Sequence, residues 1–154
     1  SAFAEKMNTT AAAIGANSSH FANSNGLPAQ QYSTARDMAR VAFYAYRNPV
    51  LRELMLHREC RFRHNSGRVS VLEATNFLLG RSAAFNGMKT GYTNAAGRCL
   101  VSSGRLNGRE VILVQLGSKT KSIFNDAARA MAWAPAPSFF FASGENSMLG
   151  DSVF

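Results

Sequence analysis

The sequence is poor in the residues that mark several common protein classes. Its 154 residues include 2 cysteines and 9 acidic side chains. Cys60 and Cys99 fit neither a CxxC metal motif nor a dense disulfide framework, and we expect two unpaired thiols rather than a single bridge. No apolar run reaches the roughly 20 residues that span a bilayer. Because Glu5 and Lys6 interrupt the opening stretch, we predict neither a signal sequence nor a membrane anchor in these residues.

Basic side chains, in contrast, are abundant. The chain carries 17 Lys and Arg residues, which gives a formal net charge of +8. A surface of this sign attracts anions such as nucleic acid, anionic lipid or acidic polymers of a cell envelope. The hydrophobic content of 46% and the charged content of 17% are ordinary for a folded domain and exclude disordered, collagen-like and coiled-coil classes.

Helical patterns occur in four segments. The first covers the opening residues and ends at Gly15, and the second runs from about Ala35 to Arg47 behind the capping-box spacing of Thr34 and Asp37. Asn48 and Pro49 predict the cap and first turn of a short third helix. The residues expected to face inward on that helix are Leu51, Leu54 and Met55. The last helix follows Lys121 and is ended by Pro135 and Pro137.

Strand patterns lie between the third and last helices. Alternating polar and apolar residues flank the turn Asn65-Ser66-Gly67, and two β-rich runs meet at Asn107-Gly108, which tolerates the positive φ of a tight turn. Helices, then antiparallel strands, then one helix form an α+β pattern without internal repeats.

A Lys-Thr-Gly triplet at residues 89–91 precedes the later strands. If it lies on a strand, alternation sends Lys89 and Gly91 to one face and Thr90 to the other, unless a bulge intervenes. Lys89 could supply charge for a substrate carboxylate, Thr90 a hydroxyl donor, and Gly91 room for a peptide against the backbone. A tripeptide alone is also found by chance at many strand ends.

The sequence on either side of the triplet makes it more informative than a tripeptide alone. K-T-G accompanies S-x-x-K in serine β-lactamases and penicillin-binding proteins. The other informative blocks, in chain order, are "FAEKMN", "SSHFANSNGLP", "YSTARDMA", "ATNFLLG", "NGMKTGYTNAAGRCLVSS" and "LGSKTKSIFNDAARAMAW". In these blocks, from about Phe3 to Trp133, the chain resembles the serine D-alanyl-D-alanine carboxypeptidases, the low-molecular-mass penicillin-binding proteins.

The resemblance implies a β-lactamase/DD-peptidase-like transpeptidase fold that is incomplete: a helical region plus the C-terminal antiparallel strands and last helix. Residues 1–134 would be the later part of the catalytic domain, and residues 135–154 a tail that could begin a second, β-rich domain. It further implies an extracytoplasmic enzyme without a cofactor or metal. Such an enzyme trims D-alanine from peptidoglycan stem peptides ending in D-Ala-D-Ala and is inhibited by β-lactams.

By the same resemblance, the substrate carboxylate is held by Lys89, Thr90 and Gly91, with Thr93 close by. A basic residue after the next strand also binds this carboxylate in the family, where it is often Arg. This chain has Lys119 there, which keeps the positive charge but cannot form the two parallel hydrogen bonds of an arginine. Since half of the domain would be missing, the resemblance also implies a partner: the N-terminal half or a second copy of the chain.

The family's nucleophile motifs do not occur in their expected place. S-x-x-K and S-x-N should precede "FAEKMN". The S-x-x-K formed by Ser118 and Lys121 falls after Lys-Thr-Gly, so we interpret it as a decoy, although a serine at a helix N-terminus with lysine one turn on suits a nucleophile. We therefore expect no catalytic residue in this chain.

Three alternatives remain. The chain could be a non-catalytic binder of peptidoglycan peptides or penicillin. It would differ from the enzyme in that the ligand binds without a covalent bond to the protein. Arginines around Phe62 could form a nucleic-acid strip, although a solvated hairpin face is the simpler interpretation. His57, Cys60 and His64, with Glu59, have spacings that zinc could use, but neighbouring arginines would repel the cation, and His20 is expected to cap or pack in its loop. The arginines of the nucleic-acid strip are Arg47, Arg52, Arg58, Arg61, Arg63 and Arg68, and those that would repel a zinc ion are Arg58, Arg61 and Arg63.

Overall fold

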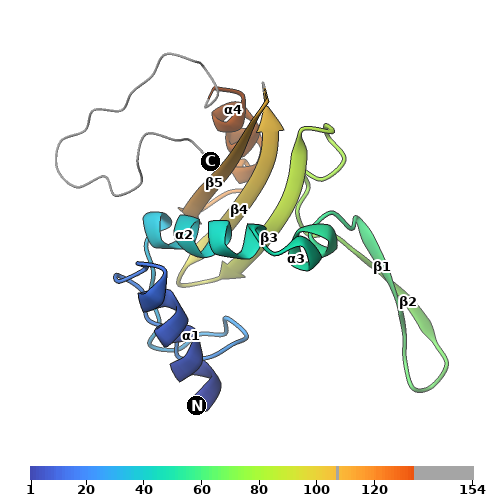
Figure 1. The fold of residues 1–154 in the computed structure, drawn as a ribbon. Coiled ribbons are helices and arrows are strands. Elements are labelled where there is room, and N and C mark those ends of the chain that lie inside the picture. Colours follow the sequence, from blue (N-terminus) through green and yellow to red (C-terminus); the bar gives the residue numbers. More distant parts are fainter. Residues whose placement is uncertain (107, 134–154) are drawn as a thin grey trace.

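Helices on both sides of a short antiparallel sheet make up the body of the protein, in a computed structural model that describes residues 1–106 and 108–133 (Figure 1). The helices are α1 (Ala2–Ala13), α2 (Ala35–Tyr46), α3 (Pro49–Leu54) and α4 (Ile123–Trp133). The strands are β1 (Glu59–Arg63), β2 (Val69–Glu73), β3 (Phe85–Thr93), β4 (Gly97–Leu106) and β5 (Arg109–Ser118). The α+β prediction is confirmed, whereas the predicted tail at 135–154 lies outside the described residues.

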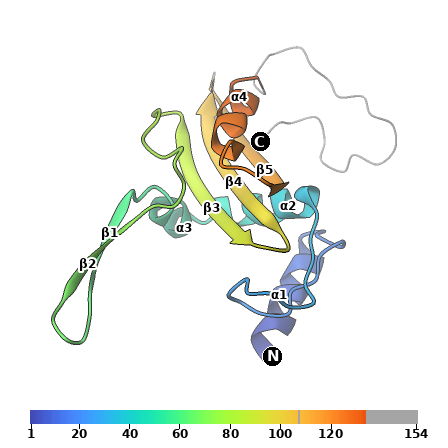
Figure 2. The ribbon, with the colours of Figure 1, turned by 180° about the vertical axis from the view of Figure 1, so that it is seen from behind.

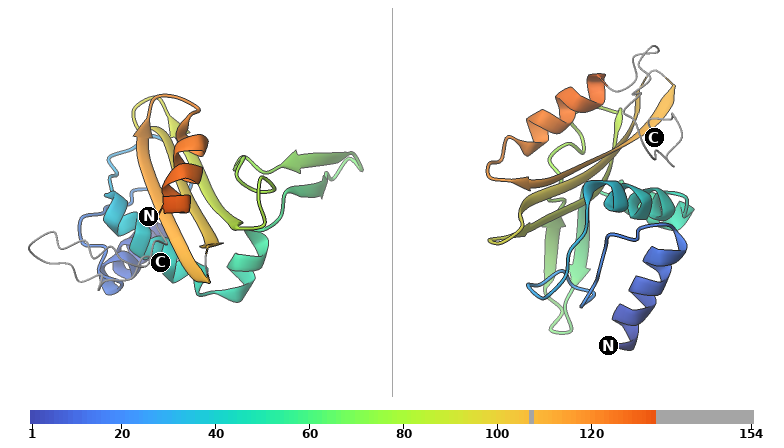
Figure 3. Two further views of the ribbon diagram at one scale, coloured as in Figure 1. Left: turned by 90° about the horizontal axis from the view of Figure 1, so that it is seen from above. Right: turned by 90° about the vertical axis from the view of Figure 1, so that its left-hand side faces the viewer.

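The main sheet is an antiparallel meander in the order β3-β4-β5. Leu106 pairs with Arg109, and Gly108 has a φ of +80°, so the predicted tight hairpin is confirmed. Helix α4 packs on one face of the sheet and α2 on the other (Figure 3). The core on the α4 side consists of Leu78, Leu100, Ile123, Phe124 and Ala127. The sheet is therefore the middle layer of three.

The second β element is a hairpin that projects from this body (Figure 2). Strands β1 and β2 pair in an unbroken antiparallel register from Glu59 opposite Glu73 to Arg63 opposite Val69. Gly67, with a φ of +83°, donates its N–H to the carbonyl of His64, which closes the predicted turn. Every residue of β1, and all but Ser70 in β2, is exposed.

Local sequence signals account for three of the helix ends. The hydroxyl of Thr34 accepts the N–H of Asp37, and Asn48 Oδ1 accepts the N–H groups of Val50 and Leu51, as the capping patterns predicted. Gly15, with a φ of +80°, follows the C-cap of α1.

The inward orientation expected for the third helix is wrong. Leu51 and Leu54 are exposed, Met55 is half-buried as the C-cap residue, and α3 buries no residue. The helix is only six residues long and sits between α2 and the projecting hairpin, so nothing in the described part of the chain covers its apolar side (Figure 1).

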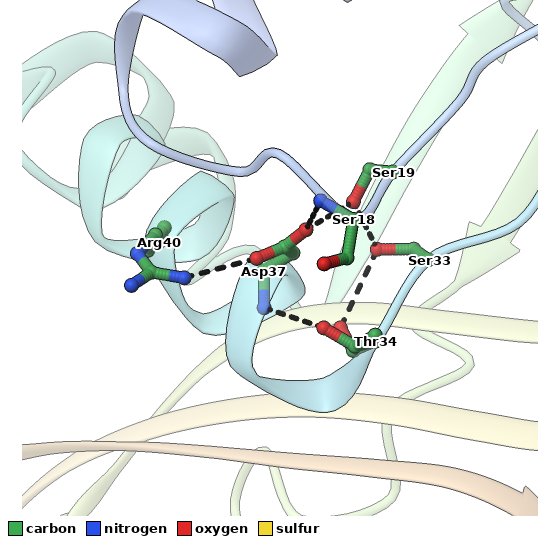
Figure 4. A network of polar contacts seen from close by, with 6 residues as sticks. All are labelled: Ser18, Ser19, Ser33, Thr34, Asp37 and Arg40. Atoms are coloured by element: carbon green, nitrogen blue, oxygen red, sulfur yellow. Dashed lines mark hydrogen bonds and ion pairs between the residues drawn. The ribbon is translucent and has the colours of Figure 1, made fainter. Parts of the chain in front are cut away.

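A buried carboxylate fixes the loop between α1 and α2 (Figure 4). Asp37 Oδ2 accepts the backbone N–H of Ser18 at 2.7 Å and the hydroxyl of Ser19 at 2.9 Å, while Oδ1 accepts Arg40 Nη1 at 2.9 Å. The Ser19 hydroxyl also pairs with that of Ser33. Because Asp37 is only 3% exposed, these bonds replace the water that its charge would otherwise hold.

Both cysteines are free, as expected: Cys60 is exposed on β1 and Cys99 is half-buried on β4. The described helices are all too short or too polar to span a bilayer.

Candidate functional site

The Lys-Thr-Gly triplet occupies the middle of β3, which is an edge strand. Lys89 lies opposite Val101, Thr90 opposite Leu100 and Gly91 opposite Cys99. The other edge of β3 pairs with no strand of the described residues. An edge strand presents unpaired backbone N–H and C=O groups, to which an extended peptide can add.

Strand alternation separates the side chains of the triplet as the sequence predicted. The register runs without a shift from Gly87 to Thr93, so Thr90 shares a face with its partner Leu100, which belongs to the core under α4. Lys89 and Gly91 face the opposite side, the side on which α2 packs. The only register shift of β3 lies earlier, between Phe85 and Gly87.

Two polar contacts orient the triplet. The hydroxyl of Thr90 lies 2.5 Å from the hydroxyl of Thr75, in the segment that leads from the projecting hairpin to β3. The ammonium group of Lys89 donates to the carbonyl oxygen of Thr90. Lys89 is exposed and forms no ion pair with any described carboxylate, so its charge is available to an anion. Sequence reasoning missed Thr75, because no motif links it to Thr90.

The start of β3 is held close to the helices. Asn86 Nδ2 donates to the hydroxyl of Tyr46 on α2 at 3.1 Å. Gly87 has a φ of +85°, and a Cβ atom there would overlap the carbonyl oxygen of Met55 and contact Leu79. Met88 has a φ of +118°, a conformation unfavourable for its side chain. This local strain immediately precedes Lys89.

The far end of β3 and the end of β5 lie at the same end of the sheet, on either side of the start of β4. Thr93 pairs with Gly97, and its hydroxyl accepts the N–H of Ala96, which closes the turn into β4. A Cβ atom on Gly97 would lie 3.0 Å from the carbonyl oxygen of Ser118, so the two strand ends approach closely. Lys119 follows Ser118 directly and is exposed. The structure thus brings Thr93 and Lys119 to the same end of the sheet.

The pair Ser118 and Lys121 has a different geometry from a nucleophile with its base. Ser118 is the last residue of β5, and its hydroxyl bonds both the carbonyl and the N–H of Thr120. Helix α4 begins only at Ile123. Neither residue therefore belongs to a helix on which lysine follows serine by one turn.

Comparison with known proteins identifies the family of this chain. Residues 1–120 match the family described as D-alanyl-D-alanine carboxypeptidase, peptidase S11. The chain belongs to this family. Its fold is that of the DD-peptidases, and β3 is the strand of this fold that carries Lys-Thr-Gly in the present chain.

Curated relatives in Escherichia coli K12 include a D-alanyl-D-alanine endopeptidase, 33% identical over 86% of this chain and 44% of the relative. Another is the D-alanyl-D-alanine carboxypeptidase DacC, 35% identical over 82% of this chain and 32% of the relative. The chain therefore spans less than half of these S11 proteins.

Solved structures agree with the fold. A D-alanyl-D-alanine carboxypeptidase from Mycobacterium tuberculosis superposes with a TM-score of 0.78 at 29% identity, over 84% of this chain and 52% of that one. The DD-transpeptidase of Streptomyces K15 gives 0.79 at 29% identity, over 85% and 53%. The predicted DD-peptidase fold is confirmed, as a partial domain.

Other candidate sites of this S11 chain are less well formed. A hollow of about 430 Å³ lies at the start of α2 rather than at β3; its lining includes Asp37 and Arg40, which already bond each other. Residues 1–106 and 108–133 contain no group of three metal-ligating side chains, so His57, Cys60 and His64 do not converge. His64 Nε2 instead contacts the hydroxyl of Ser70 at 2.8 Å. His20 packs its ring on Tyr32 within the loop.

Proposed function

We propose that this chain forms the substrate-carboxylate wall of a serine D-Ala-D-Ala carboxypeptidase, with residues 1–134 as the later part of its catalytic domain. The observation that carries the proposal is the Lys-Thr-Gly triplet on the free edge of β3, with Lys89 and Gly91 exposed and Thr90 half-buried. Lys89, Thr90 and Gly91 would bind the terminal carboxylate of a peptidoglycan stem peptide, assisted by Thr93 and Lys119. Family membership supports this substrate class.

The charges of the site suit a carboxylate. Lys89 and Lys119 are exposed basic residues on β3 and directly after β5, and neither forms an ion pair within the described residues. A charge-assisted hydrogen bond to a carboxylate is about twice as strong as a neutral one. Gly91 adds no side chain between the edge of β3 and an extended peptide, which could therefore pair with the backbone.

The reaction of the whole protein would be acyl transfer. A serine oxygen attacks the carbonyl carbon of the D-Ala-D-Ala peptide bond, the C–N bond breaks, and D-alanine leaves with a proton on its amine. Water then hydrolyses the acyl-serine ester. A β-lactam would acylate the same serine through its strained amide. We place this serine outside the present chain, which by itself would be inactive.

A partner would complete the domain. The sheet has two free edges within the described residues, on β3 and on β5, and an N-terminal half of the domain or a second copy could pair with one of them. The proposed substrate is extracytoplasmic, so the same location is proposed for the chain.

Penicillin treatment followed by intact mass spectrometry tests where the nucleophile lies. We expect the mass of the 16.7 kDa chain to remain unchanged, because Ser118 is bonded to Thr120 and lacks a helical lysine partner. Co-expression with a segment containing S-x-x-K should produce an adduct on that segment. An adduct on the present chain that disappears in Ser118→Ala would refute our placement of the nucleophile.

A D-Ala-D-Ala dipeptide tests the wall directly. In an NMR titration, the amide signals of residues 89–93 should shift, and Lys89→Gln should weaken binding about tenfold, because a charge-assisted hydrogen bond contributes about 1.5 kcal/mol or more. Lys6→Gln removes the same charge from the exposed surface of α1 and should leave binding unchanged. Equal losses in both variants, or shifts confined to the hollow beside Asp37, would contradict the assignment.

A further inference from the structure

The projecting hairpin exposes apolar side chains on both of its faces. Phe62 is 51% exposed, Val71 51% and Leu72 55%, and Val69 next to the turn is 49% exposed. Strands β1 and β2 pack chiefly on each other, as their separation from the body shows (Figures 1 and 2). An isolated two-stranded hairpin is at best marginally stable in water, so contact with an apolar surface would stabilise this one.

Charge is distributed unevenly along the hairpin. Glu59 and Glu73 are paired at its base, where it joins the body. Beyond them all formal charges are positive, on Arg61 and Arg63 in β1 and on Arg68 in the turn. No described carboxylate forms an ion pair with these three arginines. The outer part of the hairpin therefore attracts an anionic surface.

The register mixes these charges with apolar groups. On one face, Arg61 lies opposite Val71 and Arg63 opposite Val69. The other face carries Phe62 and Leu72, with the Phe62 ring held edge-on to His64 at 4.9 Å. Arginine beside exposed aliphatic and aromatic side chains suits the boundary between phosphate groups and acyl chains, because the guanidinium can reach the phosphates while its neighbours enter the apolar layer.

We propose that residues 60–72 are a docking arm for an anionic phospholipid surface. A nucleic acid offers phosphates but no apolar phase for Val69, Val71 and Leu72. A second copy of the chain would bring the same arginines together, which like-charge repulsion opposes. A bilayer rich in anionic lipid satisfies both the charges and the apolar side chains. Docking through this arm would leave the Lys-Thr-Gly edge on a separate element, β3.

Vesicle flotation tests the arm with the full chain. Vesicles of phosphatidylcholine with phosphatidylglycerol should bind the chain, and pure phosphatidylcholine should bind it far more weakly. The double variant R61Q/R63Q should bind about 30-fold more weakly, since each basic residue near an anionic membrane contributes about 1 kcal/mol. The control R105Q/R109Q removes the same charge from exposed positions of the β4–β5 hairpin and should bind within about twofold of the unmodified chain.

Apolar insertion has its own readout. F62S/L72S should lose about tenfold or more in affinity, because burying a Phe or Leu side chain contributes roughly 1.5 kcal/mol or more. In the Phe62→Trp variant, the fluorescence emission of the new tryptophan should shift to shorter wavelength when anionic vesicles are added, and not with neutral vesicles. This measurement detects insertion directly and does not depend on a variant that binds more weakly. Circular dichroism should be unchanged in all variants, since these side chains are exposed.

Several results would overturn the proposal. One is equal binding to neutral and anionic vesicles. Another is a loss of vesicle affinity in R105Q/R109Q as large as that in R61Q/R63Q. A third is displacement of the vesicles by duplex DNA at the same phosphate concentration, which would make the arm a nucleic-acid contact. Sedimentation that shows a dimer dissolved by R61Q/R63Q would make it a contact between two copies.

Discussion

Gly87→Ala is expected to lower the free energy of unfolding by about 3 kcal/mol. A left-handed φ contributes about 1 kcal/mol of this for a residue with a side chain. The rest, roughly 2 kcal/mol, comes from the new methyl group, which overlaps the carbonyl oxygen of Met55 and forces the backbone to shift. Urea denaturation followed by circular dichroism measures the loss.

A matched glycine separates the two contributions. Gly67 has nearly the same φ, +83° against +85°, but its Cβ atom would meet nothing within 4 Å. Gly67→Ala should therefore lose only about 1 kcal/mol. If both variants lose the same amount, contact between Gly87 and Met55 does not constrain the start of β3, and the packing described for that strand is wrong.

Asp37→Ala should be at least as damaging, with an expected loss of about 3 kcal/mol or more. The substitution removes the acceptor of three hydrogen bonds and leaves the charge of Arg40, whose side chain is 20% exposed, without its partner. Removing one member of a buried ion pair typically destabilises by about 3 to 5 kcal/mol. Thermal denaturation of the variant, with amide exchange of residues 17–20, would locate the loss in the loop that Asp37 holds.

The chain provides an exposed copy of the same pair as a control. Asp126 and Arg129 on α4 have the same spacing and a shorter contact, 2.6 Å against 2.9 Å, but their side chains are 40% and 81% exposed. The hydrogen bond from Arg129 lowers the pKa of Asp126. Water screens this pair, so Asp126→Ala should have a much smaller effect than Asp37→Ala. Equal losses would mean that burial is not what makes Asp37 important.

Local signals in the sequence predicted much of the fold. The N-cap at Thr34, the turns at Gly67 and Gly108, and the end of α1 all depend on residues that are near neighbours in the chain. Strand alternation alone predicted that the side chains of Lys89 and Thr90 lie on opposite faces of the sheet. Such features could be predicted because the physical cause lies within a few residues.

Features that depend on distant contacts could not be predicted in this way. The spacing of Leu51 and Leu54 indicates an apolar side of α3, but not which element covers it, and both side chains are exposed. Asp37 was recognised as a capping residue, yet its carboxylate bonds Ser18 and Ser19 instead of the start of its own helix. The contact of Thr75 with Thr90 joins two segments that only the tertiary fold brings together.

The placement of α2 against β5 has a consequence for the order in which the fold can assemble. Strands β3, β4 and β5 and helix α4 follow one another along residues 85–133, so each contact among them closes a short loop. The contact between α2 and β5 must instead enclose residues 47–108, including α3 and the projecting hairpin. Closing that loop carries the greater entropy cost. The meander with α4 is therefore the natural nucleus, and α2 is added to a sheet that already exists.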